Sequence, residues 1–352
     1  MKLLIFLLIF SSNAFSFKYE TVVSGQEIIW SMAFIENEIM FTERRGRLKV
    51  YNPITKKIRI IKGTPEVYAR GQGGLLDVKL HPDFSKNKRV YLTYSKSLKD
   101  GDRTTALGVG IYDGKSLNDF KEIFVALGES SKRHHFGSRI QFDENNNIYM
   151  TVGDRGIRPN GQDLTTHFGS VLKLDDNGKA AAGNPFIGQK GKLAAIWSYG
   201  HRNGQGLYYD KDSKVLYEME HGPRGGDEIN IITPGANYGW PIVSHGKEYA
   251  LPLWVGDYRE KNAKMVDSIK YYAPSIAPSD LLMYKGDKYP KLKGSLVVGA
   301  LAESHLHIYN LKTKKELKLF DDDDLRIRAV TLSNDGYIYF AADDGVIRKL
   351  LN

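Results

Sequence analysis

A histidine and an aspartate at the two ends of one predicted hairpin are the first candidates for chemistry in this chain. His134 and His135 precede a strand-like run at 140–142, and Asp154 follows the partner run at 148–152. The start of one strand and the end of its antiparallel partner share one sheet edge, so we expect His135 and Asp154 to lie close together. An imidazole beside a carboxylate is the arrangement of an oriented general base near neutral pH. A structural histidine that caps a loop is the alternative, and these residues alone leave both open.

Arginines form the second group of candidates. Arg202 and Asn203 lie in a glycine-rich loop, where a forked cation beside an amide suits carboxylate or quinone oxygens. Arg326 and Arg328 are two positions apart, so in a strand both side chains project to the same face. Two guanidiniums on one face repel each other unless an anion lies between them, which predicts an anion site. The alternative is an exposed strand that faces the acidic run at 321–324.

A loop at 220–230 combines acids with glycines and a proline. Its glycines and Pro223 turn the backbone so that carbonyl oxygens can point at a hard cation, which prefers six to eight oxygen ligands. Asp227 and Glu228 add carboxylates to the same loop. The spacing is not that of an EF-hand, so the loop by itself makes calcium one candidate ion and no more.

The elements that must position these groups are short β-like runs, closed by charged or glycine-rich loops. The runs recur every 40–80 residues with no sustained helical periodicity between them, which predicts an all-β, six-bladed β-propeller. A propeller gathers loops from every blade at one mouth, so polar residues far apart in sequence can face one ligand. We expect a strand after Phe17 to complete the last blade beside residues 338–350. The runs are marked by the pairs Ile39-Met40, Val90-Tyr91, Ile148-Tyr149, Leu216-Tyr217, Leu296-Val297 and Ile338-Tyr339.

Composition fits one exported β domain. The 352 residues are 41% hydrophobic and 11% aromatic, and no Pro/Ser-rich linker divides residues 17–352, so we predict a single propeller domain. Cysteine is absent, so stability must come from the sheet core, to which a bound metal could add. The net charge of +9 is scattered over the chain and lacks the clustered bases and stacking aromatics that nucleic acid requires.

Residues 1–16 resemble a signal peptide. Lys2 supplies the positive start, Leu3 to Phe10 is an unbroken apolar run, and small residues follow at 13–16. The run is too short to cross a bilayer as a helix, and we find no other candidate transmembrane segment. We therefore expect export to a periplasm, with cleavage near residue 16.

The motifs taken together resemble the soluble quinoprotein sugar dehydrogenases, which include pyrroloquinoline-quinone (PQQ) glucose dehydrogenases and the shorter aldose sugar dehydrogenases. The resemblance covers nearly all of the chain after residue 16, in order. It is carried by Gly71-Gln72-Gly73-Gly74, His81-Pro82-Asp83-Phe84, His135 with Arg139, Gly153-Asp154, Gly200-His201-Arg202-Asn203, Glu220-His221-Gly222-Pro223, Asp227-Glu228, Asn237-Tyr238-Gly239-Trp240-Pro241 and Arg326 with Arg328.

This resemblance implies a calcium- and PQQ-dependent oxidation of aldose sugars to lactones. His135 would take the hydroxyl proton of the sugar while hydride passes to PQQ, Asp154 would orient His135 and raise its basicity, and Arg202 would lie near the reacting carbonyl. The implied cofactor contacts are Gln72, Arg202, Asn203, His221, Arg326 and Arg328. The implied calcium residues are Gly222, Pro223 and Asp227 at the catalytic ion, and Glu228 and Tyr238 around a second, structural ion.

Three positions depart from the family pattern. Ala302 follows Leu301 where the family has a lysine that contacts PQQ, and losing such a contact costs roughly 1.5–3 kcal/mol. Ala273 stands where the glucose enzymes carry a tryptophan near the cofactor, and Gly204 replaces the proline after the Arg-Asn pair. These departures keep two alternatives in view: a cofactorless sugar- or envelope-binding propeller, and a calcium-dependent lactonase. For the dehydrogenase, the resemblance implies an aldose substrate and a separate electron acceptor, either a quinone or a cytochrome.

Overall fold

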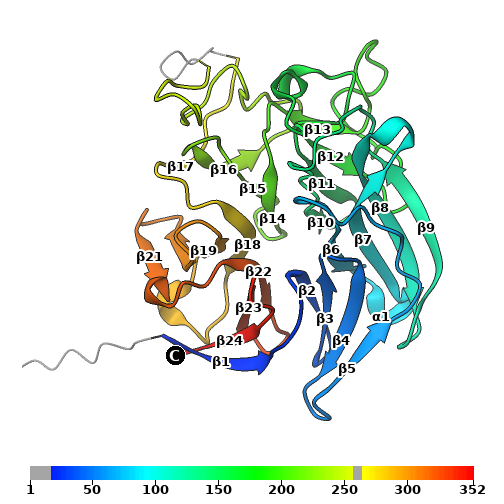
Figure 1. The fold of residues 1–352 in the computed structure, drawn as a ribbon, viewed down its shortest axis with the longest axis vertical. Helices are drawn as coiled ribbons and strands as arrows, with labels where there is room; N and C mark the ends of the chain where they lie inside the picture. Colours follow the sequence, from blue (N-terminus) through cyan, green and yellow to red (C-terminus); the bar gives the residue numbers. More distant parts are fainter. Residues whose placement is uncertain (1–16, 257–263) are drawn as a thin grey trace, which may run out of the picture.

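The computed structural model describes residues 17–256 and 264–352, which form six four-stranded antiparallel sheets around a common centre (Figure 1). The predicted signal peptide at 1–16 lies outside the described residues. The architecture is a six-bladed β-propeller, so the predicted fold class is confirmed. Many of the strands contain β-branched and aromatic residues, which pack well on the two faces of a pleated sheet.

The strands of each blade follow one another from the centre of the molecule to its rim. The first three blades are β2 (Ile29–Ile35), β3 (Glu38–Glu43), β4 (Arg47–Asn52) and β5 (Lys57–Ile61); β6 (Leu75–Leu80), β7 (Arg89–Ser97), β8 (Arg103–Tyr112) and β9 (Leu117–Val125); and β10 (Ile140–Phe142), β11 (Ile148–Val152), β12 (Ser170–Leu174) and β13 (Ile196–Tyr199). The last three are β14 (Gly204–Asp210), β15 (Val215–Glu220), β16 (Asp227–Ile232) and β17 (Lys270–Tyr272); β18 (Pro278–Tyr284), β19 (Ser295–Ala300), β20 (Leu306–Asn310) and β21 (Glu316–Leu319); and β22 (Ile327–Leu332), β23 (Ile338–Ala342), β24 (Ile347–Leu351) and β1 (Lys18–Val23).

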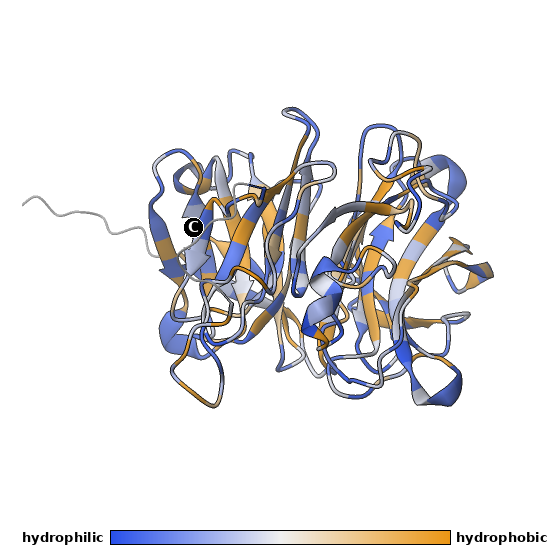
Figure 2. Cartoon of the chain, turned by 90° about the horizontal axis from the view of Figure 1, so that it is seen from above, coloured by the Kyte–Doolittle hydropathy of each residue, from blue (hydrophilic) through white to orange (hydrophobic). Residues whose placement is uncertain are grey.

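The six hydrophobic pairs that predicted the blades occupy the same place in every blade. Each lies in the second strand from the centre: β3, β7, β11, β15, β19 and β23. That strand is covered on both faces by the neighbouring blades, which explains its strongly apolar composition. Met40, Ile148, Leu296 and Ile338 are fully buried. The hydrophobic colour in Figure 2 accordingly runs along the strands, whereas the connecting loops are mostly hydrophilic.

The ring is closed by strands from the two ends of the described chain. β1 pairs antiparallel with β24, from Lys18 opposite Leu351 to Val23 opposite Ile347. The expected strand after Phe17 therefore does complete the last blade. This pairing gives β24 a hydrogen-bonded neighbour on each side, because β23 lies on its other edge.

Arg139 sits at the centre of the propeller and connects all six blades. It lies directly before β10, is 2% exposed, and stacks its guanidinium over the Trp30 ring at 4.0 Å. Its nitrogens reach polar groups on the innermost strand of every other blade: the backbone carbonyls of Trp30, Gln205, Ser279 and Arg328 and the carboxylates of Asp77 and Asp280, at 2.8–3.3 Å. This residue therefore fixes how the inner strands approach one another beneath the loops.

Helix contributes little to the described part of the chain. There the structure has one four-residue α-helix, α1 (Phe84–Asn87), and short 3₁₀ turns at Lys99–Gly101, Arg158–Gln162, Pro290–Leu292 and Asp321–Asp323. Among the described residues, no helix has the length and apolar character needed to cross a membrane.

Candidate active site

His135 and Asp154 lie in direct contact at the end of the third blade. His135 Nδ1 is 2.7 Å from Asp154 Oδ1, and the other carboxylate oxygen accepts a hydrogen bond from Trp240 Nε1 at 2.8 Å. Asp154 is 1% exposed and also accepts the backbone N–H of Gly156. The carboxylate is therefore held from several sides, and it fixes the plane of the imidazole. With Nδ1 bound to Asp154, Nε2 is the nitrogen left for a ligand.

The loop that carries His135 packs against the end of β11 at van der Waals distance. His135 has φ of 57°, a left-handed conformation that costs a non-glycine residue roughly 1–2 kcal/mol. Gly153 allows this approach, because a Cβ there would lie 2.3 Å from the His135 carbonyl oxygen. The Gln72 side-chain oxygen accepts the His135 backbone N–H at 2.8 Å and secures the loop from the second blade.

Burial sets the protonation of this pair. Burial lowers the pKa of His135 to about 4, and the Arg202 charge adds to this effect, although Asp154 opposes it. Burial alone would raise the pKa of Asp154, but the hydrogen bond and charge of His135, together with Arg202 and the Gly156 N–H, outweigh it and the pKa lies below the usual value. The histidine is therefore neutral at pH 7. Asp154 opposes the effect of burial on the pKa of His135, but burial has the larger effect.

A cavity of about 390 Å³ lies beside this loop, over the centre of the propeller. Cavities of a few hundred cubic ångströms are typical of small-molecule and cofactor sites. Phe136 and Gly137, the residues after His135, form part of its wall. Five of the residues predicted to contact a cofactor also line it: Gln72, Asn203, His221, Arg326 and Arg328.

Three guanidiniums line this cavity, and one carboxylate lies among them. Arg326 and Arg328 both pair with Asp343, at 3.3 and 2.5 Å. The anion beside the two arginines is thus a residue of the protein itself, and it lies directly after β23 rather than in the acidic run at 321–324. Arg44 is the third guanidinium, and both burial and the charge of Arg328 lower its pKa. The cavity therefore keeps an excess of positive charge for a bound anion.

Arg202 lies between the His135–Asp154 pair and the glycine-rich loop at 220–230. Its backbone carbonyl accepts the N–H of Asp154 at 2.8 Å, and its Nη1 donates to the Gly222 carbonyl at 2.6 Å and to the His221 carbonyl at 3.1 Å. Asp154 and Arg202 therefore connect His135 to Gly222 through direct hydrogen bonds. The loops far apart in sequence therefore do converge at one place.

The predicted calcium residues divide into two sets. Gly222, Glu228 and Tyr238 line a small cavity of about 10 Å³, together with Glu220, which is room for one ion or one water molecule. Asp227 is instead saturated by hydrogen bonds. It accepts from the backbone N–H of Gly222 and, on its other oxygen, from the Ser275 hydroxyl and the Ala277 N–H, so it braces the Gly222 turn. Pro223 is buried beside that turn and lines neither cavity.

The three departures from the family pattern fall in different places. Ala302 lines the 390 Å³ cavity next to Leu301, at the position where a lysine would have added a cation. Ala273 is exposed and lies on a separate groove with Tyr271 and His307, so its small size does not enlarge the cavity over the centre. Gly204 begins β14, and a Cβ there would lie 2.5 Å from Oε1 of a buried glutamate, Glu218.

Sequence reasoning missed three residues of this site. Arg44 and Asp343 each follow the second strand of a blade directly, as Asp154 follows Val152 after one glycine, so position at a strand end was the available signal. Trp240 was noted only within a motif, because nothing in the sequence shows that its indole nitrogen reaches Asp154 of the neighbouring blade.

Comparison with known proteins shows the family to which the chain is similar. A family model described as glucose/sorbosone dehydrogenase matches residues 26–349. The aldose sugar dehydrogenase YliI of Escherichia coli is 36% identical over 325 residues, which cover 90% of this chain and 87% of that protein. The crystal structure of the soluble aldose sugar dehydrogenase from Escherichia coli in the apo-form has a TM-score of 0.89 at 35% identity, covering 95% of this chain and 99% of that chain. Quinoprotein glucose dehydrogenase B of Acinetobacter calcoaceticus is 32% identical over 240 residues, 60% of this chain and 50% of that protein.

The fold and the site define a six-bladed propeller with an arginine-lined cavity at its centre and an imidazole–carboxylate pair beside it. The chain belongs to the glucose/sorbosone dehydrogenase family, since the family model spans most of its length. The resemblance that the motifs indicated is therefore confirmed at the level of the family.

Proposed function

We propose that this protein is a PQQ- and calcium-dependent dehydrogenase that oxidises aldose sugars to lactones. The observation that carries the proposal is the His135–Asp154 pair next to a 390 Å³ cavity that collects three arginines. The names of its relatives in Escherichia coli and Acinetobacter support the same substrate class and a quinone cofactor.

His135 is the proposed general base. Its Nε2 would accept the proton of the anomeric hydroxyl, while Asp154 holds Nδ1–H and stabilises the imidazolium that results. A pKa of about 4 keeps the imidazole neutral and able to accept a proton throughout the neutral range. When bound, PQQ would supply the two-electron acceptor for the hydride from the same carbon, and Ca²⁺ would supply positive charge beside the quinone.

The residues present fit a flat polyanion of the PQQ type. Arg44, Arg326 and Arg328 present guanidiniums to the cavity, and Asp343 compensates only part of their charge. Asn203 is buried at the cavity wall and offers an amide for a carbonyl or carboxylate oxygen. These groups would hold the carboxylates of the cofactor through charge-assisted hydrogen bonds.

The small cavity beside Gly222 is lined by two carboxylates, Glu220 and Glu228, and also by Arg202, which donates to the Gly222 carbonyl. Burial first, and then the charge of Glu220, raise the pKa of Glu228 well above its usual value, because two carboxylates share one buried region. A divalent ion would remove this repulsion. We propose that Gly222, Glu228 and Tyr238 would hold calcium there, with Asp227 positioning the turn and Pro223 shaping it.

The deciding experiment reconstitutes the purified protein with Ca²⁺ and PQQ and follows reduction of an artificial acceptor dye after an aldose is added. Binding of PQQ is measured separately by an absorbance titration. We expect the His135→Ala variant to bind PQQ as the wild type does and to lose turnover by about 100-fold or more. Failure of the wild type to bind PQQ at all would remove the dehydrogenase proposal.

The same preparation separates the two alternatives. A lactonase would hydrolyse a sugar lactone in the presence of calcium and the absence of PQQ. A cofactorless binding propeller would bind sugar equally well with and without His135 and would show no turnover in either assay. The arginines around the 390 Å³ cavity favour the dehydrogenase over both, because neither alternative requires a polyanion site.

We also propose export of this protein to the periplasm, on the basis of the signal-like pattern at 1–16. N-terminal sequencing of the protein recovered from an osmotic-shock fraction should begin near Phe17. Recovery of an uncleaved chain in the cytoplasmic fraction would contradict this.

A further inference from the structure

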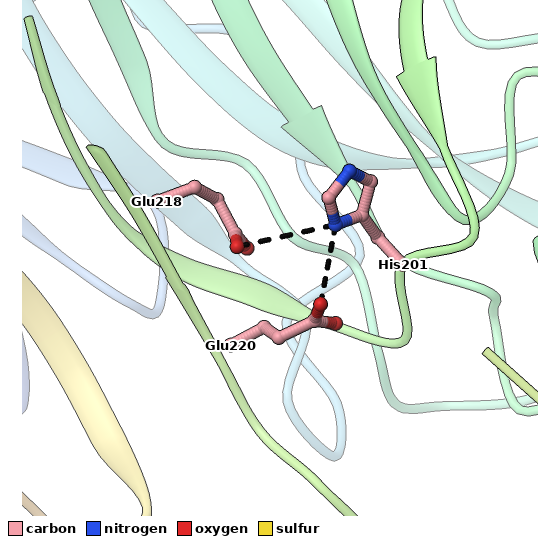
Figure 3. A group of neighbouring side chains, drawn as sticks. All are labelled: His201, Glu218 and Glu220. Carbon is pink, nitrogen blue, oxygen red and sulfur yellow. Dashed lines mark hydrogen bonds and ion pairs between the residues drawn. The ribbon is translucent and has the colours of Figure 1, made fainter. Parts of the chain in front are cut away.

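Behind the Arg202 loop, three titratable side chains converge in a fully buried cluster. Figure 3 shows His201, Glu218 and Glu220 with His201 Nδ1 directed at both carboxylates. The distances are 3.1 Å to Glu220 Oε1 and 3.9 Å to Glu218 Oε2. The candidate ligand atoms all lie within 4.8 Å of one another, and the three residues are at most 4% exposed.

The hydrogen-bond donors that contact the two glutamates of this cluster are uncharged. Glu220 Oε2 accepts the backbone N–H groups of Arg202 and Asn203, and the Asn230 amide donates to both glutamates at 3.1 and 3.3 Å. None of these donors carries a charge on the donating group.

Two buried oxygen atoms of the cluster have no hydrogen-bond partner among the described residues. They are Glu218 Oε1 and Asn230 Oδ1, and both residues are 0% exposed. An unpaired acceptor in the interior costs about 1–3 kcal/mol, and more when it is charged. The cluster therefore has acceptor oxygens in excess of donors, which is the chemistry of a cation site.

The orientation of the His201 ring is that of a metal ligand. Its Nε2 lies 2.9 Å from the Ser198 hydroxyl, which can accept Nε2–H and so leave the Nδ1 lone pair facing the carboxylates. A ligating histidine typically donates its other ring N–H to such a partner. Tyr238 stacks on the imidazole at 4.7 Å and fixes the ring orientation. A half-turn of the Asn230 amide would bring Oδ1 in as a fourth ligand.

We propose that His201, Glu218 and Glu220 form a buried site for a divalent transition-metal ion of the zinc class. One imidazole nitrogen with carboxylate oxygens is a ligand set that Zn²⁺ accepts, and its double charge neutralises the two glutamates. Calcium, which prefers six to eight oxygens, is less suited to three side chains that include an imidazole.

This site is separate from the cavity proposed for calcium. Glu218 and His201 do not line the 10 Å³ cavity beside Gly222, and only Glu220 is common to both. Cross-strand pairing explains the separation. Glu220 lies opposite Glu228, whereas Glu218 lies opposite Asn230, two residues further along the strand from the loop. A metal at the new site would anchor the backbone of Arg202 and Asn203 through Glu220.

The test measures zinc in the purified full-length chain, without PQQ or sugar. The protein is produced with and without added Zn²⁺, desalted and assayed by elemental mass spectrometry, and affinity is measured by competition with a chromophoric chelator. We expect about one equivalent of Zn²⁺ in the wild type and at least about 100-fold weaker binding in Glu218→Gln. Substitution with Co²⁺ should give the visible absorption of a low-coordinate site in the wild type only.

Glu43→Gln is the matched control. Glu43 is also fully buried and ends the second strand of its blade, but it is already paired with Arg47 at 2.6 Å and Lys49 at 2.8 Å. This variant should retain zinc. His201→Gln serves as a second ligand variant if Glu218→Gln does not fold.

Wild-type protein without zinc, zinc binding that survives both ligand variants, or retention of Ca²⁺ alone would each overturn the proposal. Because the assay contains neither cofactor nor sugar, its failure would leave the proposed dehydrogenase activity untouched. Absence of PQQ binding would likewise leave the zinc site standing.

Discussion

Arg139 provides the sharpest test of how the propeller is held together. Its guanidinium is 2% exposed and is the counter-charge for Asp77 and Asp280, which are 0% and 7% exposed. Burial raises the pKa of Asp280, and Arg139 opposes this. We therefore consider Arg139→Met, which retains an unbranched apolar stem and removes the charge and every donor.

The expected loss of stability is large. Removing one partner of a buried ion pair costs about 3–5 kcal/mol, because the other charge is left buried. The unfolding entropy is about 2.1 cal/mol/K per residue, so for a chain of 352 residues this corresponds to a fall of about 4–7 °C in Tm. The backbone carbonyls that lose their donor will add to the cost unless water replaces the guanidinium.

The assay compares calorimetric melting of Arg139→Met with that of Arg59→Met. Arg59 also pairs with a carboxylate, Glu38 at 2.7 Å, but its side chain is 37% exposed. Such a surface pair contributes about 0–1 kcal/mol, so the control should melt within about 1–2 °C of the wild type. If the two variants melt at the same temperature, Arg139 does not hold the inner strands as argued. Adding Asp280→Asn to Arg139→Met should recover part of the fall in Tm, because it removes the buried carboxylate that has lost its counter-charge.

Three further outcomes can be measured, two at the site and one at a buried histidine outside it. Asp154→Asn should lower dye reduction by about 100-fold or more, because an amide orients His135 poorly, while PQQ affinity stays within about threefold; equal turnover would refute the orienting role. Ala302→Lys should tighten PQQ binding by about 10- to 100-fold in an absorbance titration, and an unchanged titration would show that the missing lysine is irrelevant. Burial lowers the pKa of His167 from 6.5 to about 4, and its Nδ1 accepts the Leu127 N–H at 2.9 Å. The unfolded chain thus binds the proton first, so stability contributed by this group is lost as pH falls from 6.5 to 4. His167→Asn keeps an acceptor and should lose less stability than the wild type between pH 7 and 5 in urea unfolding; parallel losses would contradict the assignment.

The fold was predictable because the buried second strand of each blade gives a recurring hydrophobic pair in the sequence. Each second strand is covered on both faces, so its hydrophobic pair stands out between polar loops, and six such marks give six blades. The contact between His135 and Asp154 was predictable for a related reason, since a hairpin fixes which strand ends share an edge.

The carboxylate partners in the loops were harder to predict. Asp343 directly follows β23, the hairpin partner of β22, so it shares a sheet edge with Arg328, but no sequence pattern distinguishes it from the other acids nearby. The acidic run at 321–324 was the nearer candidate in sequence and lies elsewhere in the blade. Asp227 looked like a metal ligand, yet its carboxylate is used by backbone N–H groups that no sequence pattern reveals.

The pairing of β1 with β24 has a consequence for how this molecule folds. Lys18 lies opposite Leu351, so the final blade combines segments separated by nearly the whole chain. Closing so long a loop has an entropic cost that only the completed sheet offsets, which makes such topologies slow to form. A growing polypeptide on the ribosome can build five blades from local hairpins, but the circle stays open until its last strand emerges.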